Sequence, residues 1–193
     1  MQKEVLKNRY YAFRHGESLA NVEGIIVSDP AVGTLKYGLS ETGRRQVRES
    51  IGKADEFDDQ TLVVSSDFKR TAETAEIVRE VLGAAPVVFD TRLRERFFGG
   101  WEGASHENYS QAWKKDAYDP DQVFNGAEST RSVRERMWAV VEALEKAHSN
   151  RKIILVSHGD PLMLLNTAFE GMDARRHRSL PYFKTAGWRL LNP

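Results

Sequence analysis

The chain has 193 residues, 40% hydrophobic and 10% aromatic, which suits one globular domain over residues 1–193 with a substantial buried core. Lys plus Arg (28) balances Asp plus Glu (28), so no overall positive charge would attract nucleic acid or an anionic membrane surface, and any anion site must be local. The chain has no cysteine, which excludes a disulfide framework and a thiolate metal site.

The N-terminal stretch, MQKEVLKNRYYAF, has too short an apolar run for a signal peptide. No later stretch is long and apolar enough to span a membrane. We therefore expect a cytoplasmic protein with neither a membrane nor a nucleic-acid partner. Nothing in the sequence indicates an oligomeric state.

Several apolar runs have the length of a β-strand, and their composition is typical of strands buried on both faces of a sheet. Near the C-terminus, the segment GWRLL predicts an edge strand. The longer runs occupy residues 9–13, 61–64, 86–89 and 152–156.

Stretches with helical spacing lie between these runs. In SETGRRQVRESIGKA, residues 40–54, the apolar Val47, Ile51 and Ala54 fall on one face, and Ser40 precedes them as a predicted N-cap. This pattern predicts an amphipathic helix.

Three further helices follow the same logic. In DFKRTAETAEIVREVLG, Asp67 is the predicted N-cap and Gly83 the C-terminal stop. A longer helix begins near Ser129, and its apolar stripe includes Val133, Met137, Val140, Val141 and Leu144. A shorter helix is predicted over residues 161–169, with a proline in its first turn.

Strands that alternate with helices predict an α/β fold: a three-layer α/β/α sandwich with a mainly parallel central sheet. Two connecting segments, residues 24–39 and 99–125, exceed the usual length of a connection. We expect both to be binding loops.

Polar side chains follow each predicted strand at the point where it ends. Because ligands of open α/β sheets bind beyond the carboxyl ends of the strands, these side chains are expected to converge although they are far apart in sequence. Arg70, in the first turn of the second helix, lies near the same edge. The side chains that follow the strands are Arg14, His15, Ser65, Ser66, Asp67, Glu95 and His158.

Two histidines, two arginines and one carboxylate suit phosphoryl transfer. Guanidinium groups grip phosphate with paired hydrogen bonds, and a charge pair about 4 Å apart is worth about 4 kcal/mol at an effective dielectric near 20, so arginines can take the place of a metal ion. A neutral imidazole can attack phosphorus while a carboxylic acid protonates the departing alcohol. Since no HExxH-like spacing occurs, we expect neither a metal nor a cofactor.

Four motifs, in this order, resemble those of the histidine phosphatase superfamily, in its phosphoglycerate mutase-like branch. They are RHGESLAN, SSDFKRTAETAEI, LRERFFGGWEG and VSHGD, and GLSETGRRQ resembles the family's segment before its first helix. The resemblance spans residues 9–160. The acid phosphatase and phytase branch matches less well, because Gly159 separates His158 from Asp160.

The resemblance implies that His15 is the nucleophile that becomes phosphorylated and that Glu95 is the proton donor, with Asp160 a minor rival. Gly16 would let the backbone approach the ligand. The implied phosphate contacts are Arg14, Asn21, Arg70, His158 and Gly159.

Each of these residues also has a purely structural interpretation. Arg70 would form a helix-surface ion pair with Glu73 or Glu76, His158 would cap the next helix, and Glu95 would lie in a solvated loop. Arg14 would be a surface cation and His15 a turn histidine. The aromatic residues Phe97, Phe98 and Trp101 are interpreted as core, and the cluster Arg175, Arg176, His177 and Arg178 as a solvated basic turn rather than a second anion site at a pocket rim.

Hydrolysis of a small phosphorylated metabolite is the favoured function. RERFFGG resembles the mutase form of its motif, whereas WEG resembles the phosphatases, and mutases of this type are longer because an extra region closes over their site. The alternatives are a phosphoglycerate mutase, which returns the phosphoryl group to its substrate, and a non-catalytic module that binds a phosphorylated ligand.

Overall fold

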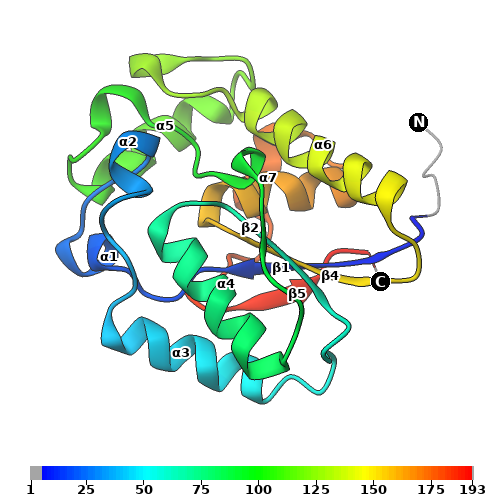
Figure 1. The fold of residues 1–193 in the computed structure, drawn as a ribbon. Coiled ribbons are helices and arrows are strands. Elements are labelled where there is room, and N and C mark those ends of the chain that lie inside the picture. Colours follow the sequence, from blue (N-terminus) through cyan, green and yellow to red (C-terminus); the bar gives the residue numbers. More distant parts are fainter. Residues whose placement is uncertain (1–5, 193) are drawn as a thin grey trace.

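The computed structural model describes residues 6–192, which contain a five-stranded sheet in the order β3-β2-β4-β1-β5 (Figure 1). All neighbouring strands are parallel except β5, which runs antiparallel to β1 at one edge. The strands are β1 (Arg9–Arg14), β2 (Leu62–Ser65), β3 (Val88–Phe89), β4 (Lys152–Ser157) and β5 (Trp188–Leu190).

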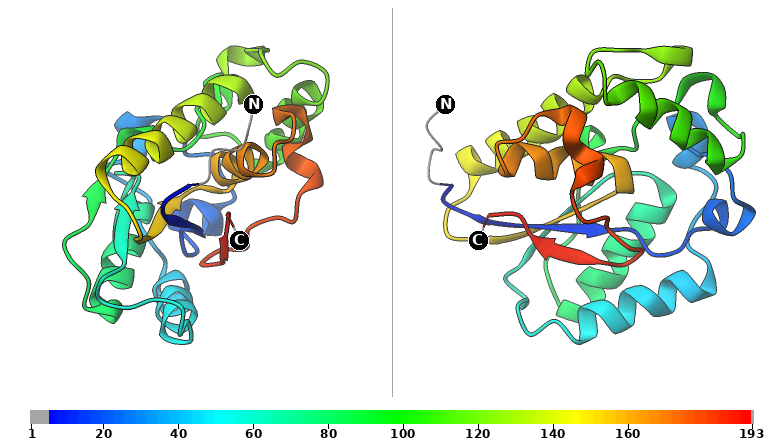
Figure 2. Two further views of the ribbon diagram at one scale, coloured as in Figure 1. Left: turned by 90° about the vertical axis from the view of Figure 1, so that its right-hand side faces the viewer. Right: turned by 180° about the vertical axis from the view of Figure 1, so that it is seen from behind.

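Helices cover both faces of the sheet, as Figures 1 and 2 show. Alternate residues of β1 point to opposite faces: Tyr10 and Ala12 pack in one buried cluster, and Tyr11 and Phe13 in the other. The first cluster includes side chains of α6 (Thr130–Ala147) and α7 (Gly159–Phe169), and the second includes those of α3 (Glu41–Gly52) and α4 (Lys69–Leu82). The predicted three-layer α/β/α sandwich is confirmed.

The strand register brings the polar side chains to one edge. Arg14 pairs with Ser157, and Ser65 pairs with Val156, so the residues that follow β1, β2 and β4 emerge at the same level. This alignment results from parallel pairing with β4 in the centre of the three strands.

The two long connections contain helices rather than loops alone. Residues 24–39 include α2 (Pro30–Gly33), and residues 99–125 include α5 (Tyr109–Asp116). With α1 (Leu19–Glu23), they gather at one end of the molecule (Figure 1). A small core holds this region together: Ile26, Phe98, Trp101, Ala112 and Ala127. Short 3₁₀ turns cover Thr91–Leu93, Gly99–Trp101, His106–Asn108, Phe124–Gly126 and Ala174–Ser179.

Most predicted helix ends are confirmed. The side chains of Ser40 and Ser129 cap α3 and α6, and Gly83 ends α4 in a left-handed conformation with φ of 66°. The predicted cap at Asp67 is wrong: α4 begins one residue later, after Phe68, because the Asp67 carboxylate pairs with Arg94 at 2.6 Å.

The other differences are at the edges of predicted elements. Strand β3 has two residues, and its side chains Val88 and Phe89 are about half exposed, so the prediction of burial on both faces is wrong for this edge strand. Helix α7 begins at Gly159, two residues before the predicted start. Across residues 6–192, no helix combines the length and the apolar character needed to cross a bilayer.

Candidate active site

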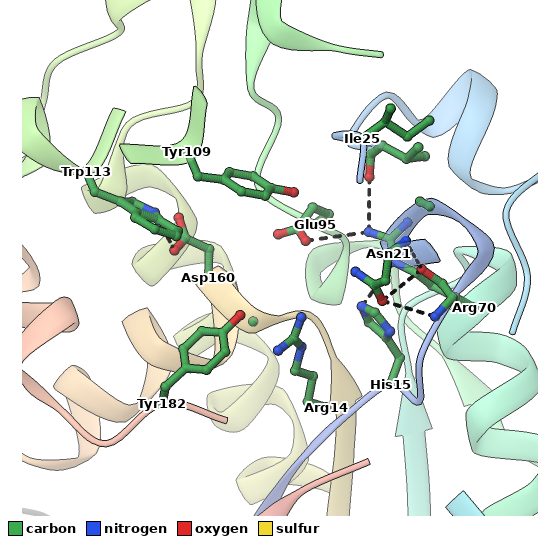
Figure 3. A pocket seen from close by; sticks show the side chains of 14 residues that line it. Arg14, His15, Asn21, Ile25, Arg70, Glu95, Tyr109, Trp113, Asp160 and Tyr182 are labelled. Carbon is green, nitrogen blue, oxygen red and sulfur yellow. Dashed lines mark hydrogen bonds and ion pairs between the residues drawn. The ribbon is translucent and has the colours of Figure 1, made fainter. Parts of the chain in front are cut away.

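A pocket lies at the carboxyl edge of the parallel strands, lined by side chains from several distant segments (Figure 3). The rings of His15 and His158 face each other with centroids 5.3 Å apart and an interplanar angle of 64°. Arg70 bridges them, because its Nε lies 3.1 Å from His15 Nε2 and 3.1 Å from His158 Nδ1. The structure therefore brings together the two histidines that end separate strands.

The ring of His15 is held in one tautomer. Its Nδ1–H donates to the carbonyl oxygen of Gly16 at 2.7 Å, so Nε2 carries the lone pair that accepts from Arg70. Burial, followed by the charges of Arg70 and Arg14, holds the pKa of His15 well below its ordinary value of 6.5. The imidazole is thus neutral at pH 7 with a free electron pair on Nε2, the state that a nucleophile requires.

His158 is equally buried and occupies the N-cap position of α7, yet its side chain caps no helix N–H. Its Nδ1 accepts from Arg70, so the Nε2–H of the neutral ring donates to Ser66 Oγ at 3.1 Å. Burial and the charge of Arg70 hold the pKa of His158 well below 6.5. The capping interpretation of His158 is therefore wrong.

The Glu95 carboxyl lies 3.5 Å from Arg70 Nη2 and 3.8 Å from His158 Nδ1. Burial raises the pKa of Glu95 to about 7, although the Arg70 charge opposes this rise. A carboxyl group with this pKa exists in both protonation states near neutral pH, as an acid that later becomes a base must.

Hydrogen bonds from a side chain of α6 hold the segment around Glu95 in place, so this segment is not a solvated loop. Arg136 donates to the carbonyl oxygens of Arg92, Arg94 and Glu95 at 2.6, 2.9 and 3.1 Å. The Oε1 of Glu95 also accepts from the backbone N–H of Arg96 at 2.9 Å. These bonds orient the carboxyl group toward the histidines.

Both predicted arginines line the pocket (Figure 3). Arg70 makes no ion pair with Glu73 or Glu76, which bind Arg44 and Arg79 instead. Within residues 6–192, the buried Nη1 of Arg70 and Nε of Arg14 have no hydrogen-bond partner. Because an unpaired buried donor is costly, these groups are suited to bind an anion.

Asn21 and Gly159 also line the pocket. Asn21 Oδ1 accepts from the backbone N–H of Ser18 at 3.0 Å, which stabilises the start of α1 and leaves the amide NH₂ for other acceptors. A Cβ at Gly159 would lie 3.0 Å from the hydroxyl of Tyr182, so a larger residue would crowd this wall.

Packing within the protein requires a glycine at position 16. A Cβ there would lie 2.6 Å from the carbonyl oxygen of Gly43, and a Cβ at Gly43 would overlap the carbonyl oxygen of Glu17. The backbone after β1 therefore packs directly against the start of α3. Close approach to this helix requires the small residue.

Sequence reasoning missed the aromatic wall of the pocket, formed by Tyr109, Trp113 and Tyr182. The first two lie on one face of α5 with stacked rings 5.4 Å apart, and their i, i+4 spacing was an available signal. Tyr182 comes from the C-terminal segment, where no pattern marked it. Phe98 and Trp101 are core residues, as predicted, whereas Phe97 is 37% exposed.

A buried ion network attaches α5 to α7. Arg96 is fully buried and donates to both oxygens of Asp116 at 2.6 and 2.8 Å, and to Asp160 at 3.2 Å. Asp160 also accepts from Trp113 Nε1 at 2.9 Å. Asp160, the rival acid, therefore has both carboxyl oxygens engaged in holding the aromatic wall.

The described part of the chain contains no group of three or more His, Cys, Asp or Glu side chains arranged to hold a metal ion. The sheet is mainly parallel, and its carboxyl edge carries two neutral imidazoles, two guanidinium groups and a carboxyl group. These features define a class of proteins suited to bind phosphoryl groups. The chain belongs to the histidine phosphatase superfamily (branch 1), whose family model matches residues 10–193.

The chain is similar to several named proteins. It is 30% identical to a glucosyl-3-phosphoglycerate phosphatase of Mycolicibacterium vanbaalenii, over 93% of this chain and 82% of the relative. It is 32% identical to a probable phosphoglycerate mutase GpmB of Erwinia tasmaniensis, over 88% of this chain and 78% of the relative. The structure of a mycobacterial glucosyl-3-phosphoglycerate phosphatase with VO₃ superposes with a TM-score of 0.79 at 29% identity, over 94% of this chain and 91% of the other.

Proposed function

We propose that this protein is a phosphatase that hydrolyses small phosphomonoesters through a phosphohistidine on His15. The observation that carries the proposal is the position of Arg70, whose Nε lies 3.1 Å from both imidazoles and whose Nη2 lies 3.5 Å from the carboxyl group of Glu95. A phosphoryl group that replaced this shared contact would meet His15 Nε2 on one side and His158 on the other.

In the first step, the lone pair of His15 Nε2 attacks phosphorus and the ester P–O bond breaks. Protonated Glu95 gives its proton to the departing oxygen, so an alcohol leaves and Glu95 becomes a carboxylate. Arg14 and Arg70 bind the phosphoryl oxygens through their unpaired donors. Asn21, His158 and the backbone of Gly159 complete the proposed phosphate contacts.

In the second step, Glu95 as a carboxylate accepts a proton from water while the water oxygen attacks phosphorus. The P–N bond breaks, phosphate leaves, and the Nε2 lone pair of His15 and the protonated Glu95 are restored. A pKa of about 7 allows Glu95 to serve in both steps near neutral pH.

Relatives support a small phosphorylated metabolite as the substrate, since one is named a glucosyl-3-phosphoglycerate phosphatase. Another is named a probable phosphoglycerate mutase, and a mutase would share the first step. The two functions differ only in the acceptor of the second step. An assay that scores free phosphate and isomerised phosphoester separately distinguishes them.

The test uses aryl phosphates with good and poor leaving groups, in excess EDTA. We expect phosphate release by the wild type, none by His15→Ala, and a loss in Glu95→Gln that grows as the leaving group becomes poorer. Activity lost on chelation and restored by metal would contradict the mechanism. An equal loss with all leaving groups would remove Glu95 from the acid role, and no turnover or phosphoenzyme with any ester would favour a binding module.

A further inference from the structure

A third arginine lies against the aromatic wall of the pocket. Arg178, in the 3₁₀ turn Ala174–Ser179, has its Cζ 3.7 Å from the ring centroid of Trp113 and 5.2 Å from that of Tyr182. Both rings line the pocket and are seen in Figure 3. The expectation of a solvated basic turn is wrong for His177, which is fully buried, whereas the three arginines of this turn are exposed. The guanidinium of Arg178 nevertheless packs against two pocket residues.

The same wall connects Arg178 to the proposed phosphoryl site. The ring of Tyr182 lies 5.0 Å from Arg14 Cζ as well as 5.2 Å from Arg178 Cζ. The two guanidinium groups are thus separated by no more than the sum of these distances. Arg178 is not itself among the residues that line the pocket, but this limit is short enough for a substrate of a few bonds to contact both guanidinium groups.

Within the described residues, the guanidinium of Arg178 has one weak partner, an ion pair with Asp160. Its nearest acidic atom, Asp160 Oδ1, is 3.9 Å away and already accepts from Trp113, while Asp160 Oδ2 accepts from Arg96. Among residues 6–192, the guanidinium of Arg178 makes no hydrogen bond, and its side chain is 33% exposed. Stacking on an aromatic face fixes the plane of a guanidinium and leaves the N–H groups at its edge free.

We propose that Arg178 is a specificity-determining residue that binds a second anionic group, a carboxylate or a second phosphate, on the alcohol part of the phosphomonoester. This inference rests on the proposed function, because it assumes that the phosphoryl group lies between His15 and Arg14. A planar guanidinium edge matches either anion with two parallel hydrogen bonds. Preferred substrates therefore carry two anionic groups a few bonds apart.

The test compares three esters with one carbon chain: 3-hydroxypropyl phosphate, 3-(phosphonooxy)propanoate and propane-1,3-diyl bisphosphate. Phosphate release is measured for the wild type, for Arg178→Gln and Arg178→Lys, and for Arg176→Gln. Arg176 is an exposed arginine two residues away. Its replacement makes the same change in net charge and leaves the stacking of Arg178 on Trp113 and Tyr182 in place. Thermal unfolding of each variant confirms that it is folded.

We expect the wild type to prefer the anionic esters over the hydroxyl ester in kcat/KM. Arg178→Gln should reduce this preference about fivefold to tenfold, mainly through KM, as for a partly exposed charged hydrogen bond. Arg178→Lys should lie between Arg178→Gln and the wild type, since it keeps the charge without the planar fork. A preference for only one of the two anionic esters identifies the group that Arg178 binds.

Two outcomes would overturn the inference about Arg178 and leave the proposed function intact. One is an equal kcat/KM for all three esters in the wild type. The other is the same loss of preference for the anionic esters in Arg176→Gln and Arg178→Gln. The second result would mean that only net charge matters. Failure of the proposed function is recognised separately, since the wild type would then release no phosphate from these esters or from 4-nitrophenyl phosphate.

Discussion

Replacing Glu95 by glutamine should make the protein more stable at high pH than the wild type, by an amount set by the burial of this carboxyl group. The native state keeps the Glu95 proton up to a pKa of about 7, whereas the unfolded chain releases it above the ordinary value of 4.5. Because the folded pKa is raised, the wild type loses stability as the pH rises from 4.5 to 7. At about 1.4 kcal/mol for each unit of pKa, the loss is about 3 kcal/mol.

The assay is urea unfolding of the wild type and Glu95→Gln from pH 4 to pH 8.5. The free energy of unfolding of the variant, minus that of the wild type, should rise by about 3 kcal/mol, with the rise between pH 4.5 and 7. Glu142→Gln, an exposed change in α6, is the control and should alter stability by less than about 0.5 kcal/mol at every pH. A difference for Glu95→Gln that does not change with pH would refute the reasoning.

Three other substitutions test the support of the site. Ser66→Ala leaves the buried Nε2–H of His158 without its acceptor, so kcat should fall about tenfold in a steady-state assay; an unchanged kcat would mean that Ser66 does not orient the ring. Asp116→Ala removes the main partner of buried Arg96, so the free energy of unfolding, measured in urea, should fall by about 3 kcal/mol. A loss below about 1 kcal/mol would mean that this ion network does not stabilise the protein. Gly43→Ala should lower the free energy of unfolding by about 2 kcal/mol or more, because the added Cβ would overlap the carbonyl of Glu17. An unchanged free energy of unfolding would contradict this packing.

The position of the pocket could be predicted because it depends on parallel pairing alone. Arg14 ends β1 and His15 follows it, while Ser66 follows β2 and His158 follows β4. The register of these strands brings their carboxyl ends to one level. Apolar runs and capping residues locate the strands and helices, so the sequence is sufficient for this part of the site. The motif resemblance then selects which polar residues matter.

The aromatic wall could not be predicted because it depends on contacts between segments far apart in sequence. Helix α5 is positioned by the Arg96–Asp116 pair and by the hydrogen bond from Trp113 to Asp160, across 20 and 47 residues of chain. No local pattern encodes such partners. For the same reason Asp67 fails as a helix cap, since a distant residue, Arg94, binds its carboxylate.

The most direct test of the proposed function is a rapid-quench experiment with a phosphomonoester, followed by mass spectrometry of the denatured protein under neutral to alkaline conditions that preserve phosphohistidine. We expect one phosphoryl group on His15, absent in His15→Gln and longer-lived in Glu95→Gln, which lacks the base for the second step. Turnover of the same ester by the wild type with no phosphoryl group on His15 at any quench time, or undiminished turnover by His15→Gln, would contradict it.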